Sequence, residues 1–186
     1  GSGNIVPTGT TYTWSAPAAI TGISGLAAGT AQTTIGGTLT NATAAPINVT
    51  YVVTPSSGSC AGVSFTVVVT VNPRPAITNM TATICSATAF TAAPVNVTNG
   101  VVPTGTTYTW TVAANANVTG ETAVATASNN ISQTLTNTTV NAEIVSYTVT
   151  PTANTCDGAT FTVAVTVNPI PVIANKTAVM CSGTAF

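Results

Sequence analysis

Five side chains carry a formal charge near neutrality, and they are the residues from which acid–base chemistry would have to be built. The acids are Glu121, Glu143 and Asp157, the bases are Arg74 and Lys176, and histidine is absent. General acid–base catalysis needs poised groups within reach of one substrate. Three scattered carboxylates without a histidine do not indicate such a pair. We therefore expect no enzyme, no catalytic residue and no cofactor.

The chain also has few residues that could bind a metal ion. Calcium prefers about six to eight oxygens, usually several of them from carboxylates, and the chain has three acids in all. A serine triad would need histidine or a substitute base, and Lys176 is the single lysine. We expect no metal site.

Four cysteines remain as reactive groups, namely Cys60, Cys85, Cys156 and Cys181. None is part of a Cys-x-x-Cys pair, and a zinc site would need all four thiolates to converge. An even number of cysteines in a chain rich in Thr and Ser is typical of disulfides in an oxidising compartment. Pairing Cys85 with Cys156 leaves two cysteines over. Pairing Cys60 with Cys85 and Cys156 with Cys181 leaves none, and we favour this second pairing.

The composition excludes several classes of protein. Charged residues make up 3% of the chain, against about 25% in ordinary domains. The net charge of −1 gives no electrostatic footprint for nucleic acid or an anionic membrane. No apolar run reaches the roughly 20 residues of a membrane-spanning helix. Disordered chains are rich in charge and poor in β-branched residues, and this chain is the reverse.

The chain contains an internal repeat, in which two copies of one sequence are offset by 96 residues. The segment from Val6 to Trp14 recurs as the segment from Val102 to Trp110. The same offset relates Cys60 to Cys156 and Cys85 to Cys181, without a net insertion. A repeat of this length is the size of a domain, much longer than a solenoid unit. The residues that stand 96 positions before the three acids are Gly25, Ile47 and Ala61, so acidic chemistry is not shared between the copies.

Each copy alternates in the manner of β-strands. Residues 106–112, 143–150 and 160–167 place apolar side chains on one face. We expect weaker strands at 76–84, 88–98, 117–126 and 130–136. The predicted fold class is all-β, as tandem immunoglobulin-like antiparallel β-sandwiches of about seven strands each. The large aromatic residues on these strands are the expected core anchors: Trp14, Trp110, Tyr51 and Tyr147.

Two divisions into units fit the sequence. In the first, the proline pairs at 72–75 and 168–171 are linkers, because two close prolines stiffen a connection. The units are then 1–72, which lacks its opening strands, 73–168, and 169–186 as the start of a third copy or a closing strand of the second. In the second division, 4–90 and 100–186 are equal units joined by 91–99.

Several segments carry a family resemblance. They are Tyr-Thr-Trp at 108–110, Thr-Leu-Thr-Asn at 134–137, Tyr-Thr-Val-Thr-Pro at 147–151, Val-Thr-Val-Asn-Pro at 165–169 and Cys-Ser-Gly at 181–183. Here the chain resembles the PKD-like and immunoglobulin-like repeats of giant surface proteins in Bacteroidota. The resemblance implies secretion by the type IX route and an extracellular role at the cell surface, as in gliding-motility adhesins.

We expect a structural stalk or adhesin repeat that extends or forms a surface filament. Its expected partners are neighbouring repeats of the same protein, with surface polysaccharide or self-association as further options, and no nucleic acid. Two alternatives stay open. Exposed strand edges such as 65–71 favour a filament subunit that assembles by strand exchange. Exposed aromatic side chains would favour a glycan-binding module, although both tryptophans have apolar neighbours typical of a core.

Overall fold

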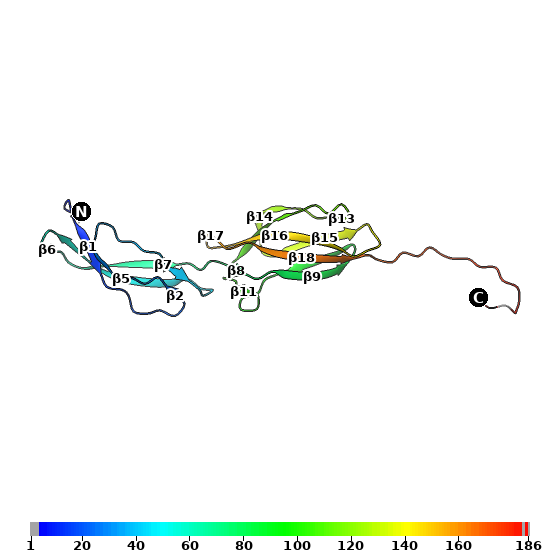
Figure 1. The fold of residues 1–186 in the computed structure, drawn as a ribbon, viewed down its shortest axis with the longest axis horizontal. Coiled ribbons are helices and arrows are strands. Elements are labelled where there is room, and N and C mark those ends of the chain that lie inside the picture. The colour runs from blue at the N-terminus through cyan, green and yellow to red at the C-terminus, as the bar shows by residue number, and fades with distance from the viewer. Residues whose placement is uncertain (1–3, 184, 186) are drawn as a thin grey trace.

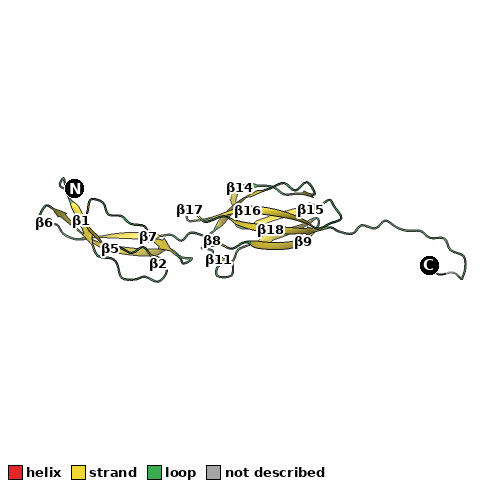
Figure 2. Cartoon of the chain, in the orientation of Figure 1, coloured by secondary structure: helices red, strands yellow, loops and turns green. Residues whose placement is uncertain are grey.

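The computed structural model describes residues 4–183 and 185, and within them every regular element is a β-strand (Figure 2). Threonine and valine are frequent in these strands because branching at Cβ stiffens the side chain in the extended backbone. The strands form two units that follow one another along the long axis of the molecule (Figure 1). The prediction of an all-β fold with tandem units is confirmed.

The second unit has one large sheet. Strand β16 (Glu143–Ala153) lies at its centre, with Tyr147 opposite Val163 of β18 (Phe161–Asn168). The strand order is β14 (Val124–Ser128), β12 (Thr107–Val112), β16, β18 and β9 (Met80–Cys85), and the short β17 (Cys156–Asp157) pairs with the end of β16.

A smaller sheet covers one face of the large sheet. Its order is β10 (Thr88–Ala92), β15 (Ile131–Asn137) and β13 (Val118–Thr119), and a separate pair joins β8 (Ala76–Ile77) to β11 (Gly100–Val101). Phe90 and Leu135 from the small sheet and Tyr147 from the large sheet share one buried core. Two sheets with one core between them make a β-sandwich. Seven of its strands have five or more residues, as the sequence predicted.

One pair departs from the predicted antiparallel pattern. Strand β9 runs parallel to β18, from Met80 opposite Val163 to Cys85 opposite Asn168. Parallel neighbours need a long crossover between them, and here nearly the whole unit separates β9 from β18 in the sequence. Strand β9 therefore closes the edge of the large sheet with the first residues of the unit.

The first unit repeats this sheet without its closing strand. The order is β3 (Gly29–Gln32), β1 (Thr11–Trp14), β5 (Ile47–Ser57) and β6 (Cys60–Ala61), with β7 (Phe65–Val71) also paired to β5. A small pair, β2 (Ile23–Ser24) with β4 (Thr40–Asn41), covers it. Within residues 4–71 there is no counterpart of β9 or β10. Strand β7, the counterpart of β18, is consequently a sheet edge.

The short β4 illustrates how strands depend on their neighbours. Its counterpart β15 has seven residues and bonds to β10 along its length, whereas β4 has two. Gly36 and Gly37 stand where β15 has Ser132 and Gln133. Glycine weakens a strand because it has the most backbone freedom to lose. Without a β10 partner, this segment has nothing on that side to hold it extended.

Candidate functional site

Two of the three acids meet at a single asparagine. The Glu121 carboxylate accepts a hydrogen bond from the backbone N–H of Asn115 at 2.7 Å. The side-chain amide of Asn115 donates to Glu143 at 3.2 Å, and Asn117 donates to the other oxygen of Glu143 at 2.9 Å. Asp157 lies apart, where it accepts a hydrogen bond from the Thr152 hydroxyl at 2.6 Å. The sequence did not indicate that Glu121 and Glu143 share a partner.

This arrangement of Glu121 and Glu143 holds a loop in place and does not bring together an acid and a base poised for catalysis. Both oxygens of Glu143 accept amide hydrogens, which ties the 115–117 loop to the start of β16. One oxygen of Glu121 is buried without a hydrogen-bond partner. Among the described residues, no three His, Cys, Asp or Glu side chains are grouped closely enough to hold a metal ion. The counterparts Gly25 and Ile47 cannot form this cluster in the first unit.

Two buried tyrosines make the free energy of unfolding of the second unit depend on pH in the alkaline range. Burial, followed by the Glu121 carboxylate, raises the pKa of Tyr147 well above its ordinary value, and burial raises the pKa of Tyr108. A group whose pKa is raised on folding contributes stability below its unfolded pKa, and this stability is lost as the pH rises through the folded pKa. For tyrosine the loss begins above about pH 10.

We therefore expect a melting temperature that is nearly constant between about pH 4 and 9 and falls above about pH 10. Thermal unfolding followed by circular dichroism measures it. A Tyr147→Phe variant should flatten the alkaline limb, because the ionising hydroxyl is gone. A strong shift between pH 4 and 9 would contradict the expectation, since so few side chains of this protein carry charge.

The structure holds Cys60, Cys85 and Cys156 as thiols, so the disulfide pairs predicted from the sequence are not formed. Cys60 lies in β6 of the first unit and Cys85 at the end of β9 in the second. A disulfide requires Cα atoms about 4.4–6.8 Å apart. The sequence-based pairing assumed a hairpin around the proline turn, whereas that turn links two separate units.

The other pairings fail for a related reason. Cys156 pairs with Ala153, the last residue of β16, near the beginning of β18. Cys85 lies opposite Asn168, at the other end of β18. Those ends are separated by roughly the length of a ten-residue strand, about 34 Å. Cys181 is exposed in the segment that continues from Asn168. Both cysteines considered as partners of Cys156 thus belong to the opposite end of the unit.

The four aromatic residues chosen as anchors lie in the two cores. Trp110 and Tyr147 are 5% and 0% exposed, and Trp14 and Tyr51 are 7% and 9% exposed. Both indole N–H groups donate to a backbone carbonyl, Trp14 to Ala27 at 3.1 Å and Trp110 to Thr122 at 3.0 Å. Each tryptophan is thereby buried without an unsatisfied donor.

Sequence reasoning missed a buried asparagine that fastens each unit. The Asn137 amide donates to the carbonyls of Asn141 at 2.6 Å and Val167 at 2.8 Å, and its oxygen accepts from the Thr139 N–H at 2.8 Å. Asn41 makes the equivalent bonds in the first unit. The repeated Leu-Thr-Asn-x-Thr at 39–43 and 135–139 was the available signal. We call the hydrogen bonds around Asn137, and the equivalent bonds around Asn41, the asparagine clasp.

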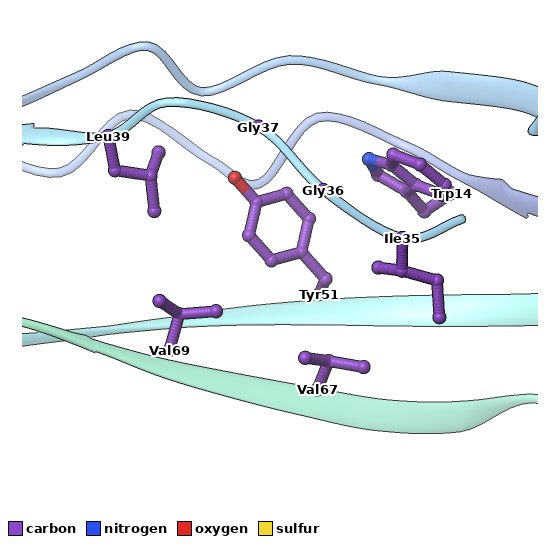
Figure 3. A pocket seen from close by; sticks show the side chains of 8 residues that line it. All are labelled: Trp14, Ile35, Gly36, Gly37, Leu39, Tyr51, Val67 and Val69. Carbon is purple, nitrogen blue, oxygen red and sulfur yellow. The ribbon is translucent and has the colours of Figure 1, made fainter.

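The first unit carries an apolar hollow. A hollow of about 130 Å³ opens beside the Tyr51 ring, between strands β5 and β7 and the glycine-containing segment before β4 (Figure 3). Its lining is almost entirely apolar, and consists of Trp14, Ile35, Gly36, Gly37, Leu39, Tyr51, Val67 and Val69. In the second unit the corresponding place is occupied, because Phe90 of β10 lies 5.3 Å from Tyr147, ring centre to ring centre.

Two repeated sandwiches, each centred on a tryptophan and a tyrosine, define the chain as a tandem immunoglobulin-type β-sandwich protein. The chain belongs to the PKD-like domain family, which matches residues 2–75 and again 82–171. No curated protein matches the sequence significantly. Domains of this family are often extracellular structural or adhesion modules and are generally non-catalytic. In the described part of the chain, no helix is long and apolar enough to cross a membrane.

Proposed function

We propose that the chain is a stretch of structural repeats that extends a stalk or an adhesive filament at the cell surface. One observation carries the proposal: the polypeptide enters the second unit at one end and leaves it at the other (Figure 1). Units connected in this way add their lengths. The longest strand of the second unit, β16, has 11 residues, and at about 3.4 Å per residue each copy adds on the order of 40 Å.

The connection between the units supports this role. Pro73 is fully buried and Pro75 is buried too, whereas Pro171, which has no unit after it in the structure, is exposed. The Pro75 carbonyl lies so close to Gly158 that a Cβ added there would come within 2.2 Å of it. Prolines packed in this manner restrict bending, which favours reach over flexibility.

The surface suits the same role. Threonine, serine and asparagine keep the exterior soluble by neutral hydrogen bonding, and such a surface is little affected by salt. We propose an extracellular location on this basis, and because PKD-like domains are typically extracellular. The resemblance to Bacteroidota surface proteins supports a finer proposal, an adhesin of the gliding-motility type exported by the type IX route.

We propose residues 73–168 as the repeating unit and 169–186 as the beginning of a further copy. The support is that β9 and β10 bond to β18 and β15, which binds residues 80–92 to the second unit rather than the first.

Small-angle X-ray scattering on chains that carry two, three and four copies of 73–168 tests the stalk proposal. We expect the maximum dimension to grow by about 40 Å for each copy. A Gly158→Val change in every copy should shorten the average dimension, because it displaces Pro75. Growth much below this increment in the unaltered chains would show that the copies fold back on one another, which a stalk cannot do.

A glycan-binding role finds less support. Phe65 is 41% exposed and packs edge to face against Tyr12, with ring centres 6.4 Å apart. Its counterpart Phe161 makes the same contact with Tyr108 and is 2% exposed. Phe65 is therefore exposed because no described strand pairs with the outer edge of β7, and its exposure does not indicate a platform for sugar stacking.

A further inference from the structure

The cysteines of the second unit lie at opposite ends of its sandwich. Cys85 is the last residue of β9 and lies opposite Asn168, where the chain leaves the unit. Cys156 begins β17 and lies opposite Ala153, at the end where the chain enters. Cys60 has the corresponding place in β6 of the first unit. A single unit therefore cannot join its own two cysteines.

The hairpin formed by β16 and β17 extends past the beginning of β18. Strand β18 begins at Phe161, which pairs with Val149, so residues 150–153 of β16 project beyond it. The turn at Asn154 and Thr155 has a positive φ at both residues, 47° and 65°, as in a type I′ hairpin. The hairpin lies at the end of the second unit that faces the first unit (Figure 1).

The linker between the units runs beside this hairpin. The Pro75 carbonyl lies against Gly158, and the N–H of Gly158 donates to the Pro151 carbonyl at 2.8 Å, which fixes it to β16. Cys156 is two residues nearer the tip of the hairpin, and so up to about 7 Å closer to the preceding unit. Asn72 stands three residues before Pro75, at most about 11 Å away. Cys156 therefore reaches along much of the linker toward the preceding unit.

The other cysteine lies where a unit ends. Cys85 and Asn168 are partners on adjacent strands, which places their Cα atoms about 4.8 Å apart. The linker that follows Asn168 repeats the one that begins at Asn72, because both have the sequence Asn-Pro-x-Pro. Cys85 is exposed, so its thiol is open to a partner from outside its unit. Where one complete copy follows another, a cysteine of each kind is thus brought to the same junction.

We propose that, in the tandem array, Cys85 of one copy forms a disulfide with the cysteine at the Cys156 position of the following copy. The proposal rests on the proposed function, because it requires copies that follow one another end to end. As the Sγ–Sγ bond forms, the two thiols lose two protons and two electrons. A small-molecule disulfide accepts both and is reduced to two thiols.

This bond gives every cysteine of an interior copy one partner. Such a copy has two cysteines, one at each end, and forms one bond with the copy before it and one with the copy after it. A covalent link beside the proline linker holds each junction at two points. Two points restrict bending more than one does, which suits a stalk.

A chain in which residues 1–168 are followed by a second copy of residues 73–168 provides the test. Serine replaces every cysteine except Cys85 of the first part and the cysteine at the Cys156 position of the added copy. Circular dichroism verifies that the added copy is folded. The chain is oxidised with oxidised glutathione, and linked peptides from the monomer fraction are identified by mass spectrometry. We expect an intramolecular disulfide between the two cysteines in most of the chains.

Two matched variants of this chain distinguish a defined junction from chance contact. One keeps only Cys85 and Cys156 of the same unit, which are closer in sequence but lie at opposite ends of the sandwich. The other combines Cys85→Ser with Thr83→Cys, which moves the thiol two residues back along the exposed face of β9. Each should give at most about one tenth of the yield. An equal yield in either variant, or the absence of the expected link, would overturn the proposal.

Small-angle X-ray scattering of the same chain in its reduced form distinguishes failure of the disulfide from failure of the stalk. An extended chain that forms no link on oxidation would overturn the disulfide and leave the stalk proposal standing. A chain whose units fold back on one another and form no link would overturn both.

Discussion

A Trp110→Ala variant should unfold the second unit under conditions in which the parent chain is folded. Trp110 is 5% exposed at the centre of β12, and its indole N–H donates to Thr122 at 3.0 Å. Truncation of a buried tryptophan to alanine costs about 3–5 kcal/mol, and a whole domain is stable by about 5–15 kcal/mol. At an m-value of about 1–3 kcal/mol/M, the urea midpoint should fall by about 2 M.

Trp14 remains in this variant and reports on the first unit by its fluorescence, while far-ultraviolet circular dichroism follows both units. Val140→Ala is the control, because Val140 is 89% exposed and its loss should change the stability by less than about 0.5 kcal/mol. If Trp110→Ala and Val140→Ala unfolded at the same midpoint, Trp110 would not be an anchor of the core.

The second large effect on stability is expected from replacing Asn137, the buried asparagine of the clasp in the second unit. Asn137→Ala removes two donors from the carbonyls of Asn141 and Val167 and one acceptor from Thr139. Asn137 is 8% exposed, so water cannot easily replace these bonds. Each buried polar group left without a partner costs about 1–3 kcal/mol. We expect a total loss of about 2–4 kcal/mol in the free energy of unfolding, measured by urea denaturation.

Two further variants show whether the clasp is responsible. Asn141→Ala makes the same chemical change at an exposed residue that takes part through its backbone carbonyl, and it should cost little. Asn137→Asp keeps the acceptor for Thr139 and loses both donors, so it should be nearly as unstable as Asn137→Ala. An Asn137→Ala variant no less stable than Asn141→Ala would show that the clasp does not hold the unit together.

Much of the fold could be predicted from local pattern. Alternation along 143–150 put Val145, Tyr147 and Val149 on one face, and all three are buried in the core. The exact offset of 96 residues indicated a tandem array. These features were readable because strand alternation and repetition are properties of residues close in sequence or identical in type.

Contacts between distant residues were not readable. Glu121 and Glu143 meet at Asn115 although the sequence shows no pattern linking them. The cysteine pairing was wrong because arithmetic on sequence positions cannot tell a hairpin from a junction between units. The parallel pairing of β9 with β18 joins residues about a whole repeat apart, and alternation is the same for parallel and antiparallel neighbours.

Composition and periodicity were enough to indicate a charge-poor, repeated β protein with aromatic anchors, because both are local properties that can be read without knowing which segments pair. The strand that closes the large sheet of the second unit became evident only from the packed structure. Val69 and Val165 have the same type and setting in the sequence, yet one is exposed and the other buried. The reason is physical: burial of a strand face depends on the neighbour that covers it, and that neighbour is supplied from far away in the chain.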